Sequence, residues 1–425
     1  MCFTLKDHIQ SHVAEEIRLT QSLQVQEKFS EYYKKYSVNL IPPSMIRQRE
    51  FGFILLKEGI MLRHKSFENL GNLRSFLAST TPSDVYHSSA YYEKPEAVMK
   101  EKGWLGADLV FDIDADHIPT PCNKVHDRWI CSSCGFAGLG ACPDKCPSCE
   151  GARFDSRTWT CEACLESAKD ETRKLLRILT EDFGLDDDKL SVYYSGNRGY
   201  HVHVESKSIH QLDSAARKEI ADYTIGLGFT AGLHGLIGKG RIVIGPSSER
   251  TGWRASIASG VNEFLIHAEN TDLEKLGLPK KIIDFLIKNR RTILSRLSES
   301  GWIDVKGVGV KSWNQIIDWI ADRQASKIDT VVTTDIHRLI RLGGSLHGKT
   351  GFKKTKVPPF GLDQFDPLDE GVAFEDGEMV VNIVEAPRFR IGENYYGPFR
   401  KESKIALPTA AALFLLCRGA AQGVE

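Results

Sequence analysis

Cysteine spacing constrains the fold of this chain more than any other feature of its sequence. Eight of the ten cysteines lie between Cys122 and Cys164, so this stretch forms a unit of its own. Four of them follow the paired spacing Cys131-x2-Cys134-x11-Cys146-x2-Cys149. Two Cys-x2-Cys pairs at this separation are a strong signal for one tetrahedral zinc ion. Because four protein ligands close such a site, we expect the zinc to be structural.

A second set of possible zinc ligands surrounds these four cysteines. Cys122 and His126 precede them, and Cys161 and Cys164 follow them at the start of a predicted helix. Together these four side chains form another closed set for a structural zinc ion. Reactive or merely buried cysteines are the alternative interpretation, and the presence of two independent quartets argues against it.

Composition places the chain among ordinary globular proteins. Its 425 residues leave room for two or three domains, at roughly 150 residues for each. The hydrophobic fraction of 41% and the charged fraction of 26% exclude a collagen, a disordered tail protein and a disulfide-stapled miniprotein. The formal charge is 55 − 56 = −1, so any site for an anion must be built locally.

The sequence contains no stretch that approaches the roughly 20 apolar residues of a membrane-spanning helix. The longest apolar run, near Leu407 to Leu416, predicts a packed terminal helix. The N-terminus begins with charged residues and lacks the apolar core of a signal peptide. We therefore expect a cytoplasmic protein with no membrane partner, in which cysteines bind metal rather than form disulfides.

Hydrophobic periodicity and turn residues divide the remaining chain into helical and β-rich blocks. Helices are predicted at residues 4–36 and 165–183. The stretch at 212–323 is mainly helical, with helices predicted for example at 280–297 and 312–325. Strands are predicted at residues 106–114, 190–194, 200–204 and 329–333. Because the helical block lies between β-rich blocks, it is predicted to be an insertion into an α+β domain.

One predicted strand carries two carboxylates on the same face. Alternate residues of a strand share a face, so Asp112 and Asp114 project together while Phe111 and Ile113 point into the core. Strands generally exclude aspartate, and two adjacent carboxylates repel each other. A divalent cation such as Mg²⁺ would neutralise them and bind substrate phosphates. A strand end capped by turn-forming aspartates is the alternative interpretation of this pattern on its own.

The predicted hairpin at 190–204 has groups suited to phosphate at its tip. Ser195 offers a hydroxyl and Arg198 a guanidinium fork, and the glycines beside them let backbone N–H groups approach an anion. His201 and His203 share one face of the following strand. A plain surface hairpin with two half-buried histidines is the alternative.

A second basic and glycine-rich segment lies near the C-terminal end of the β-rich blocks. Residues 338–351 contain four glycines and the four potential cations Arg338, Arg341, His347 and Lys349. The spacing is not that of a Walker loop, yet the composition is that of a triphosphate clamp. Residues 336–362 contain six Lys and Arg without an acid, and residues 363–385 contain eight acids without Lys or Arg. A glycine-rich loop with incidental charge is the alternative.

Three of these segments together resemble a known family. VFDIDADH at 110–117, SGNRGYHVHV at 195–204 and RLIRLGGSLHGKTG at 338–351 resemble the catalytic small subunit of archaeal-eukaryotic DNA primases, in its archaeal form. Residues 46–53 and 91–95 also look like that family, and the resemblance extends in order from about residue 30 to about residue 360. Each motif is weak alone, whereas the ordered set is specific.

The resemblance implies an α+β fold: a primase-type catalytic core with a mixed central β-sheet, an inserted zinc-binding module and a small helical subdomain. The corresponding division is core at 1–121, zinc module at 122–164, core at 165–225, helical subdomain at 226–326, and core with C-terminal tail at 327–425. The family usually has one zinc site of the outer type, so the ribbon at 130–158 is interpreted as an insertion nested within that site. Cys142 is then a spare thiol or exchanges with Cys146.

The resemblance also assigns roles to individual residues. Asp112 and Asp114 match the first two metal-binding aspartates; Asp329 is our choice for the third, with Asp335 as the competitor. The residues that match nucleotide contacts are Ser195, Arg198, His201, Arg341, His347 and Lys349. Asn197 departs from the pattern, because relatives often have a second basic residue at that position.

The function implied is synthesis of short primers from nucleoside triphosphates on a single-stranded DNA template, with two Mg²⁺ or Mn²⁺ ions. NTPs, dNTPs or both would be substrates, and the partner would be a large primase subunit that carries an iron–sulfur cluster. One alternative is a zinc-ribbon nucleic-acid-binding module without catalysis. Another is a repair-type primase-polymerase that extends primed ends.

Overall fold

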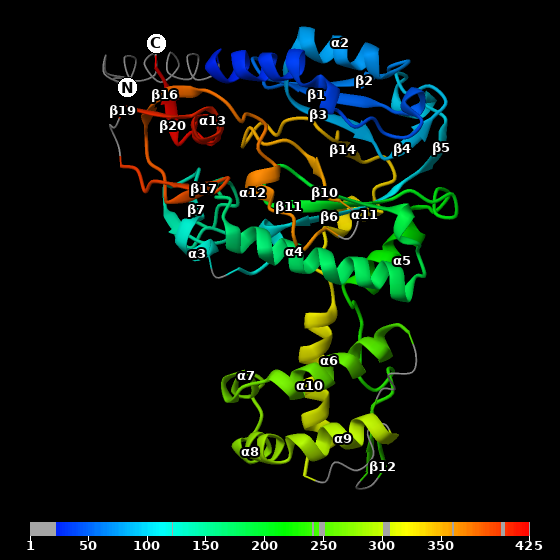
Figure 1. Cartoon of the computed structure of the whole chain (residues 1–425). Helices are drawn as coiled ribbons and strands as arrows, with labels where there is room; N and C mark the ends of the chain where they lie inside the picture. Colours follow the sequence, from blue (N-terminus) through cyan, green and yellow to red (C-terminus); the bar gives the residue numbers. More distant parts are fainter. Residues whose placement is uncertain are drawn as a thin grey trace. The chain divides into compact units, whose positions relative to one another are not determined.

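The computed structural model describes residues 23–120, 122–239, 242–245, 251–300, 307–358, 361–400 and 404–424. The chain divides into two compact units, which are described separately below. The first comprises Met1–Asp170, Lys189–Arg217 and Asp329–Glu425, and the second comprises Glu171–Asp188 and Lys218–Ile328. Several sheets and many helices confirm the predicted α+β class (Figure 1).

One four-stranded sheet of the first unit has the order β14-β3-β1-β2. Its strands are β1 (Phe51–Leu55), β2 (Met61–Lys65), β3 (Pro82–Ser88) and β14 (Leu339–Arg341), all paired antiparallel. Helix α2 (Leu70–Thr80) begins where the Asn69 side chain accepts a hydrogen bond from the Asn72 N–H at 3.0 Å. This cap satisfies a backbone donor at the helix start. Residues 23–35 are also helical, and the first part of the helix predicted at 4–36 lies outside the described residues.

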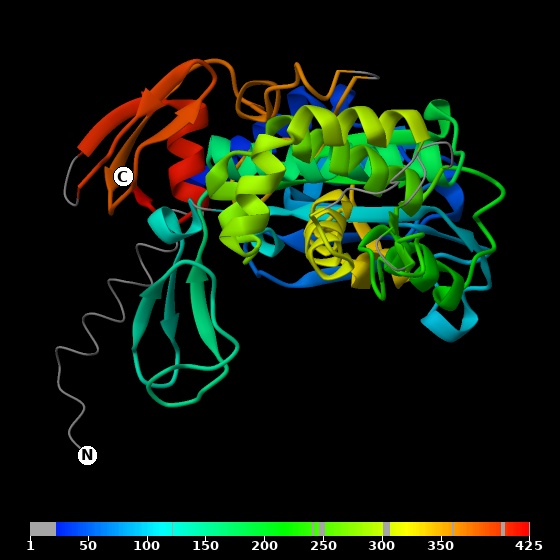
Figure 2. The same ribbon diagram turned by 90° about the horizontal axis from the view of Figure 1, so that it is seen from below.

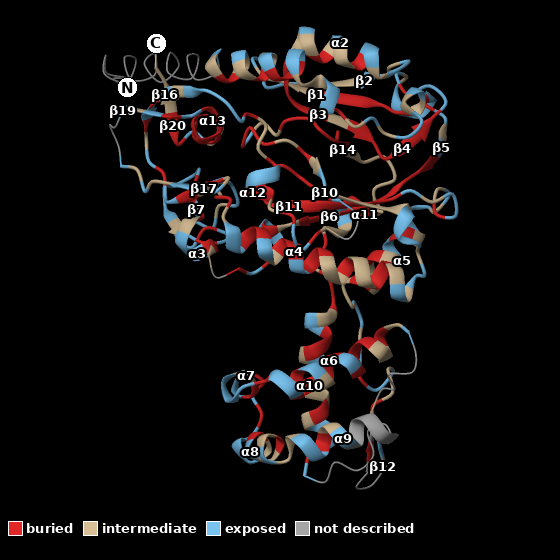
Figure 3. Cartoon of the chain, in the orientation of Figure 1, coloured by how far each residue is buried: buried red, intermediate tan, exposed pale blue. Residues whose placement is uncertain are grey.

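The second four-stranded sheet of this unit contains both motif-bearing strands. Its order is β15 (Thr355–Lys356), β10 (Leu190–Tyr194), β11 (Gly199–Val204) and β6 (Leu109–Asp114), again antiparallel. The predicted hairpin is therefore confirmed, and its second strand lies beside the carboxylate strand. Strand β11 is buried along its whole length (Figure 3). The central sheet expected from the resemblance is thus present as two four-stranded sheets, whose strand pairs are all antiparallel rather than mixed.

Gly199 permits the close pairing of β11 with β6. A Cβ at this position would lie 1.9 Å from the carbonyl oxygen of Ile113, which no side chain could tolerate. The pairing places His201 opposite Asp112. On the same strand, the ring of His203 lies 6.3 Å from the ring of His87 on β3, so the two four-stranded sheets meet through these side chains.

The cysteine-rich stretch forms a small sheet of its own. Strands β7 (Arg128–Cys131), β8 (Ala137–Leu139) and β9 (Phe154–Arg157) pair in the order β8-β7-β9. Figure 2 shows these strands as a separate ribbon. Trp129 is its small core, with Phe136 and Phe154 at ring-centroid distances of 6.0 and 5.4 Å. The short helix α3 (Asn123–His126) precedes the ribbon and helix α4 (Glu162–Arg177) follows it.

The remaining elements of the first unit include a C-terminal layer. Helix α13 (Thr409–Cys417) is the packed terminal helix predicted from the apolar run, and it packs on the sheet of β19 (Lys404–Pro408), β16 (Glu378–Ile383) and β20 (Ala421–Gly423). The other elements are β4 (Ala90–Tyr92), β5 (Trp104–Ala107), β17 (Phe389–Ile391), β18 (Asn394–Tyr396) and α12 (Pro367–Glu370).

Among the described residues, no helix is both long enough and apolar enough to span a bilayer.

The second unit is mainly helical and has its own hydrophobic core. Trp313 is fully buried in this core, which also contains Ile257 and Ile317. The elements lying wholly in this unit are α6 (Trp253–His267), α7 (Asn270–Lys275), α8 (Lys280–Lys288), α9 (Arg290–Ser300), α10 (Val310–Gln324) and the strands β12 (Ile237–Lys239) and β13 (Ile242–Ile244). Helix α5 (Ser214–Thr224) crosses the boundary between the two units. The helix predicted at 280–297 is two helices that meet at Asn289, whose side chain bonds to the Phe285 carbonyl at 2.9 Å.

Other predicted elements also differ from the structure. The strand predicted at 106–114 is divided at Asp108 between β5 and β6, which belong to different sheets. The strand predicted at 329–333 is wrong, because Thr330–Thr334 forms helix α11. Its run of Thr and Val favours a strand, yet the Asp329 side chain accepts a hydrogen bond from the Val331 N–H at 2.9 Å and starts a helix instead. The helix predicted at 165–183 begins earlier, at Glu162, and continues beyond Arg177 as a π-helical turn at Ile178–Asp182.

Candidate active site and zinc centres

Three aspartates from distant parts of the chain converge at one edge of the second sheet. Asp112 and Asp114 lie on the same face of β6. The backbone N–H of Asp329 donates to the Asp112 carbonyl at 2.8 Å, which places the start of α11 beside that strand. Below them, Val332 of α11 packs in a buried cluster with Val110 of β6. A hydrogen bond and an apolar contact therefore hold the third aspartate beside the first two.

The electrostatics of Asp112 show how closely these carboxylates interact. Its pKa is raised to about 7, first by burial and then by the negative charges of Asp114 and Asp329. The positive charges of Arg338 and His117 oppose this rise. A carboxylate whose pKa is raised by neighbouring carboxylates is suited to share a divalent cation with them, because the cation binds oxygen ligands and removes the repulsion.

The competing Asp335 faces different neighbours. Its side chain accepts a hydrogen bond from the His337 N–H at 2.9 Å, and its charge raises the pKa of Tyr92. The Tyr92 hydroxyl in turn bonds to the His337 ring at 2.9 Å. The geometry therefore favours Asp329 over Asp335 as the third carboxylate of this cluster.

The hairpin strand places a neutral histidine against the carboxylates. His201 Nε2 lies 3.5 Å from Asp112 Oδ1, and the histidine is almost fully buried. Burial and neighbouring cations, Lys354 first among them, hold the pKa of His201 well below its usual range. At the hairpin tip, the Ser195 hydroxyl accepts a hydrogen bond from the Asn197 N–H at 3.4 Å. His201 thus lies beside Asp112, and Ser195 lies at the tip of the same hairpin, where its N–H donates to the Gly199 carbonyl at 2.9 Å.

Arg198 is in a different environment from the one its motif suggests. Its guanidinium is fully buried and donates to Asp116 at 2.5 Å and to Asp127 at 3.2 Å. It also lies 3.4 Å from the sulfur of Cys164. In this structure the side chain therefore connects the hairpin tip with the outer cysteine quartet rather than presenting an open fork to solvent.

The glycine-rich segment after β14 lies against the hairpin tip. The Thr350 hydroxyl donates to the Gly196 carbonyl at 2.5 Å, and a Cβ on Gly196 would lie 3.1 Å from the Cβ of His347. The His347 ring accepts a hydrogen bond from the Lys349 N–H at 3.1 Å, and the Lys349 side chain is exposed. The two segments predicted to bind phosphate are therefore brought together, with one exposed cation.

Asp84 organises this segment and has no signal in the sequence. Its carboxylate accepts from the Arg341 guanidinium at 2.6 Å and from the Gly348 N–H at 3.1 Å. Although burial opposes ionisation, the charges of Arg341 and His347 lower the pKa of Asp84 to about 2. Asp84 thus fixes a cation and a loop N–H in place. Only the three-dimensional pairing of β3 with β14 brings Asp84 to this site.

Lys354 is a second residue that sequence reasoning missed. Its ammonium is buried, donates to the Arg341 carbonyl at 2.8 Å and lies 3.1 Å from His203 Nε2. Burial, followed by the charge of Arg341, holds the pKa of Lys354 well below its usual range. Lys354 therefore supports the backbone of β14 from behind the site through its bond to the Arg341 carbonyl.

The four outer cysteine and histidine side chains form a metal-binding geometry. Ligand atoms of Cys122, His126, Cys161 and Cys164 all lie within 4.8 Å of one another. The two closest pairs, Cys122 with Cys164 and His126 with Cys161, are each 3.2 Å apart. The other ring nitrogen of His126 bonds to Asp127 at 2.7 Å, the carboxylate support that is typical of zinc-bound histidine.

The four inner cysteines form an equally compact quartet. Sulfur atoms of Cys131 and Cys149 lie 3.6 Å apart, as do those of Cys134 and Cys146. Tetrahedral zinc with bonds of about 2.3 Å separates its sulfurs by about 3.7 Å, so the donor set and the spacing both fit zinc. The exposed Cys142 is not in the quartet, and Cys146 is.

Comparisons with known proteins identify the family. The family model described as DNA primase small subunit matches residues 144–358. The DNA primase small subunit PriS of Methanothrix thermoacetophila is 36% identical to this chain, over 94% of the chain and 98% of that relative. PriS proteins of Cenarchaeum symbiosum and Archaeoglobus fulgidus are each 33% identical, over 93% of the chain and 96% of each relative. A converging aspartate cluster, a basic loop against the tip of the neighbouring hairpin and near full-length similarity together place this chain in the DNA primase small subunit family.

Proposed function

We propose that this chain is the catalytic subunit of a DNA primase. It would join nucleoside triphosphates on single-stranded DNA without a pre-existing primer, in support of DNA replication. The observation that carries the proposal is the convergence of Asp112, Asp114 and Asp329 beside the basic segment after β14, in a member of the primase small subunit family. A site of this composition suits phosphoryl transfer, in which catalysis is mainly positioning and charge stabilisation.

The three aspartates would hold two Mg²⁺ or Mn²⁺ ions. Such ions activate the attacking hydroxyl and stabilise the leaving pyrophosphate during in-line displacement. The donor set fits them, because hard cations prefer carboxylate oxygens and the charges of Asp114 and Asp329 already raise the pKa of Asp112. The neutral His201 beside Asp112 can donate a hydrogen bond without adding a charge that would compete with a cation.

The basic segment would bind the triphosphate. Lys349 is exposed and free to reach a phosphate, whereas Arg341 is held by Asp84 and presents a fixed positive charge. His347 and the hydroxyl of Ser195 lie on the two segments that Thr350 joins. Arg198 would act mainly by positioning the hairpin tip, since a direct contact with phosphate would require it to leave Asp116.

The zinc ions would be structural. The outer quartet would anchor the hairpin tip through Arg198, and the inner quartet would hold the ribbon at 130–158. We retain the five-part division of the chain, a cytoplasmic location and an iron–sulfur large subunit as parts of this proposal. The names of the relatives as small subunits support a larger partner.

An assay on unprimed template tests the proposal. Purified chain, with and without the large subunit, is incubated with single-stranded DNA, NTPs or dNTPs and Mn²⁺, and new oligonucleotides are measured. We expect products with the native chain and none with Asp112→Asn. Lys349→Ala should mainly raise the apparent KM for nucleotide, because it removes an exposed cation but no metal ligand.

Two outcomes would support the alternatives. Template binding without any product, in both protein preparations, would favour a zinc-ribbon binding module. Extension of primed ends without synthesis on unprimed strands would favour a repair-type enzyme. Near-normal turnover by Asp112→Asn would refute the metal assignment in either case.

A further inference from the structure

The helical unit contains a cavity of about 690 Å³ that none of the roles above uses. It lies between α6, α10 and the C-terminal half of α4, all within the second unit. Gly260 lets α6 and α10 pack closely beside it, because a Cβ there would lie 2.5 Å from Ile320. The volume is in the range of pockets that hold small organic groups.

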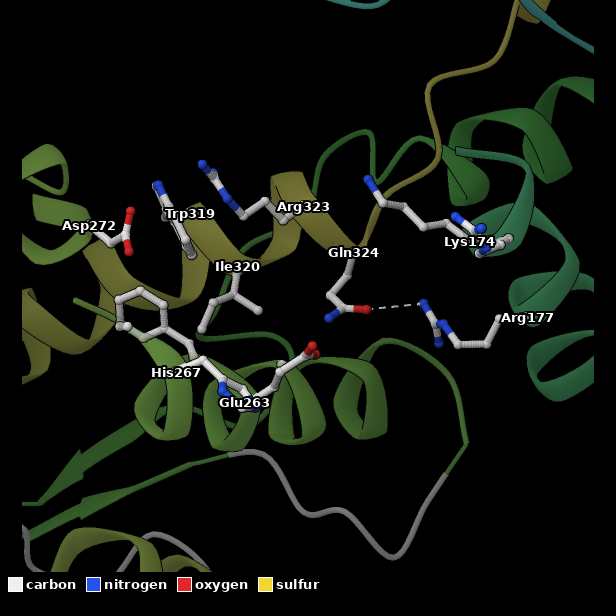
Figure 4. A pocket seen from close by; sticks show the side chains of 13 residues that line it. Lys174, Arg177, Glu263, His267, Asp272, Trp319, Ile320, Arg323 and Gln324 are labelled. Carbon is white, nitrogen blue, oxygen red and sulfur yellow. Dashed lines mark hydrogen bonds between the residues drawn. The ribbon is translucent and has the colours of Figure 1, made fainter. Parts of the chain in front are cut away.

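The wall of this cavity is rich in cations. Arg173, Lys174 and Arg177 line it from α4, and Arg323 lines it from α10. Figure 4 shows Lys174 and Arg177 at one end and Trp319, His267 and Asp272 at the other. Four permanent cations line the cavity together with the carboxylates of Glu263 and Asp272, and two further glutamates, Glu171 and Glu181, pair with Lys174 and Arg177 from outside the lining.

Several of these cations are held in place and keep donors free. Lys174 pairs with Glu171 at 2.7 Å. Arg177 donates to Ser256 at 2.8 Å and to Gln324 at 3.4 Å, and it lies 3.7 Å from the Glu181 carboxylate. An ammonium has three donors and a guanidinium five, so these contacts leave N–H groups for an anion. The Lys174 and Arg177 side chains are 28% and 27% exposed, which keeps those groups accessible.

The other end of the cavity offers an aromatic surface. The guanidinium of Arg323 lies over the Trp319 ring at 3.4 Å, and Phe264 packs against the same ring at 4.8 Å. Planar cations and aromatic rings of this kind stack with nucleic-acid bases, while Lys and Arg bind the phosphates. The cavity therefore offers both a stacking surface for a base and cations for a phosphate, the two groups that one nucleotide of a strand presents.

We propose that this cavity binds a nucleotide of single-stranded nucleic acid, with phosphate at the α4 end and the base at the Trp319 end. A nucleic-acid strand carries one negative charge per phosphate, so a bound nucleotide is repelled only weakly by the Glu263 carboxylate in the cavity wall. A free triphosphate would concentrate several negative charges beside that group, which disfavours it. That the strand is the DNA template rests on the proposed function, whereas strand binding itself does not.

Fluorescence anisotropy of a labelled single-stranded oligonucleotide tests this proposal with the full chain. Measurements without nucleotide or divalent metal remove any dependence on catalysis. The double variant Lys174→Ala with Arg323→Gln should weaken binding about tenfold. The slope of log affinity against log salt concentration should become shallower by about 0.7 for each phosphate that the variant no longer neutralises. Trp319→Leu should also weaken binding, and Trp319→Phe should restore most of it.

Matched controls make the outcome decisive. Lys288→Ala removes an exposed cation of α8 in the same unit, away from the cavity, and should leave the affinity unchanged. Equal affinity of the double variant and Lys288→Ala would overturn the proposal. So would a loss confined to labelled ATP with oligonucleotide binding unchanged, which would make the cavity a site for free nucleotide. Because Asp112→Asn is tested by synthesis and these variants by binding, the two proposals can fail independently.

Discussion

At the scale of single residues, the carboxylate cluster should lower the folding stability of the protein when no metal is bound. The raised pKa of Asp112, about 7, means that the folded chain holds this proton more tightly than the unfolded chain does. In the absence of divalent cations, stability should therefore fall as pH rises from about 4 to about 8. The loss should be on the order of 4 kcal/mol.

Urea unfolding of the native chain and of Asp112→Asn, in EDTA, checks this expectation. The variant should lack most of the pH-dependent loss and should be the more stable protein at pH 8. Added Mg²⁺ should stabilise the native chain and have little effect on Asp112→Asn. Parallel pH profiles for the two proteins would show that the carboxylates do not repel one another.

Residues near Asp112 also show what could be inferred from the sequence. The alternation of Asp112 and Asp114 with Phe111 and Ile113 is a local pattern, so it could be read directly. Asp84 and Lys354 reach the site only through pairing of strands and packing of sheets, which no local pattern encodes. Arg198 was recognisable, but its ion pairs with Asp116 and Asp127 are a property of the folded chain.

At the scale of elements, the pairing of β11 with β6 positions the site. Gly199→Ala should force these strands apart, because the new Cβ would meet the Ile113 carbonyl. We expect a stability loss on the order of 1–3 kcal/mol and a larger loss of primer synthesis, since His201 moves with β11. Gly232→Ala, where a Cβ meets nothing within 4 Å, is the control for both measurements. Unchanged synthesis in Gly199→Ala would mean that the strand register does not position the site.

The two Cys/His quartets proposed to bind zinc should respond differently to loss of a ligand. Cys131→Ser should remove one zinc and unfold the ribbon with little effect on synthesis. Cys164→Ser should remove the other zinc and lower synthesis, because Arg198 and the hairpin tip lose an anchor. Zinc content and primer synthesis, measured on the same samples, would distinguish the effects of the two substitutions. A selective loss of template binding in Cys131→Ser would instead give the ribbon a direct role.

Helices and strands could be predicted from the sequence where the hydrophobic pattern was strong. The prediction failed where a helix cap, rather than residue propensity, decided the secondary structure. The hairpin at 190–204 and the terminal helix followed from alternation and from an apolar run. The segment after Asp329 has β-branched residues that favour a strand, and a single hydrogen bond to the Asp329 side chain converts it into helix α11. Propensity is a weak guide when a cap or tertiary packing opposes it.

At the scale of the whole molecule, the two units have separate hydrophobic cores. Trp313 is fully buried in the helical unit, so Trp313→Ala should cost that unit roughly 3–5 kcal/mol. Calorimetry should show two transitions, of which only the one belonging to the helical unit moves, with both zinc ions retained. A single transition that shifts as a whole would show that the units unfold together.

The two ends of the three-stranded ribbon, where it joins the rest of the chain, lie side by side. Arg128 and Arg157, at its two ends, are paired neighbours on β7 and β9. A segment whose ends adjoin can be lengthened, shortened or exchanged for a tight turn while the aspartates stay where they are. The ribbon is therefore a natural position at which to graft a reporter or a foreign binding module onto the enzyme.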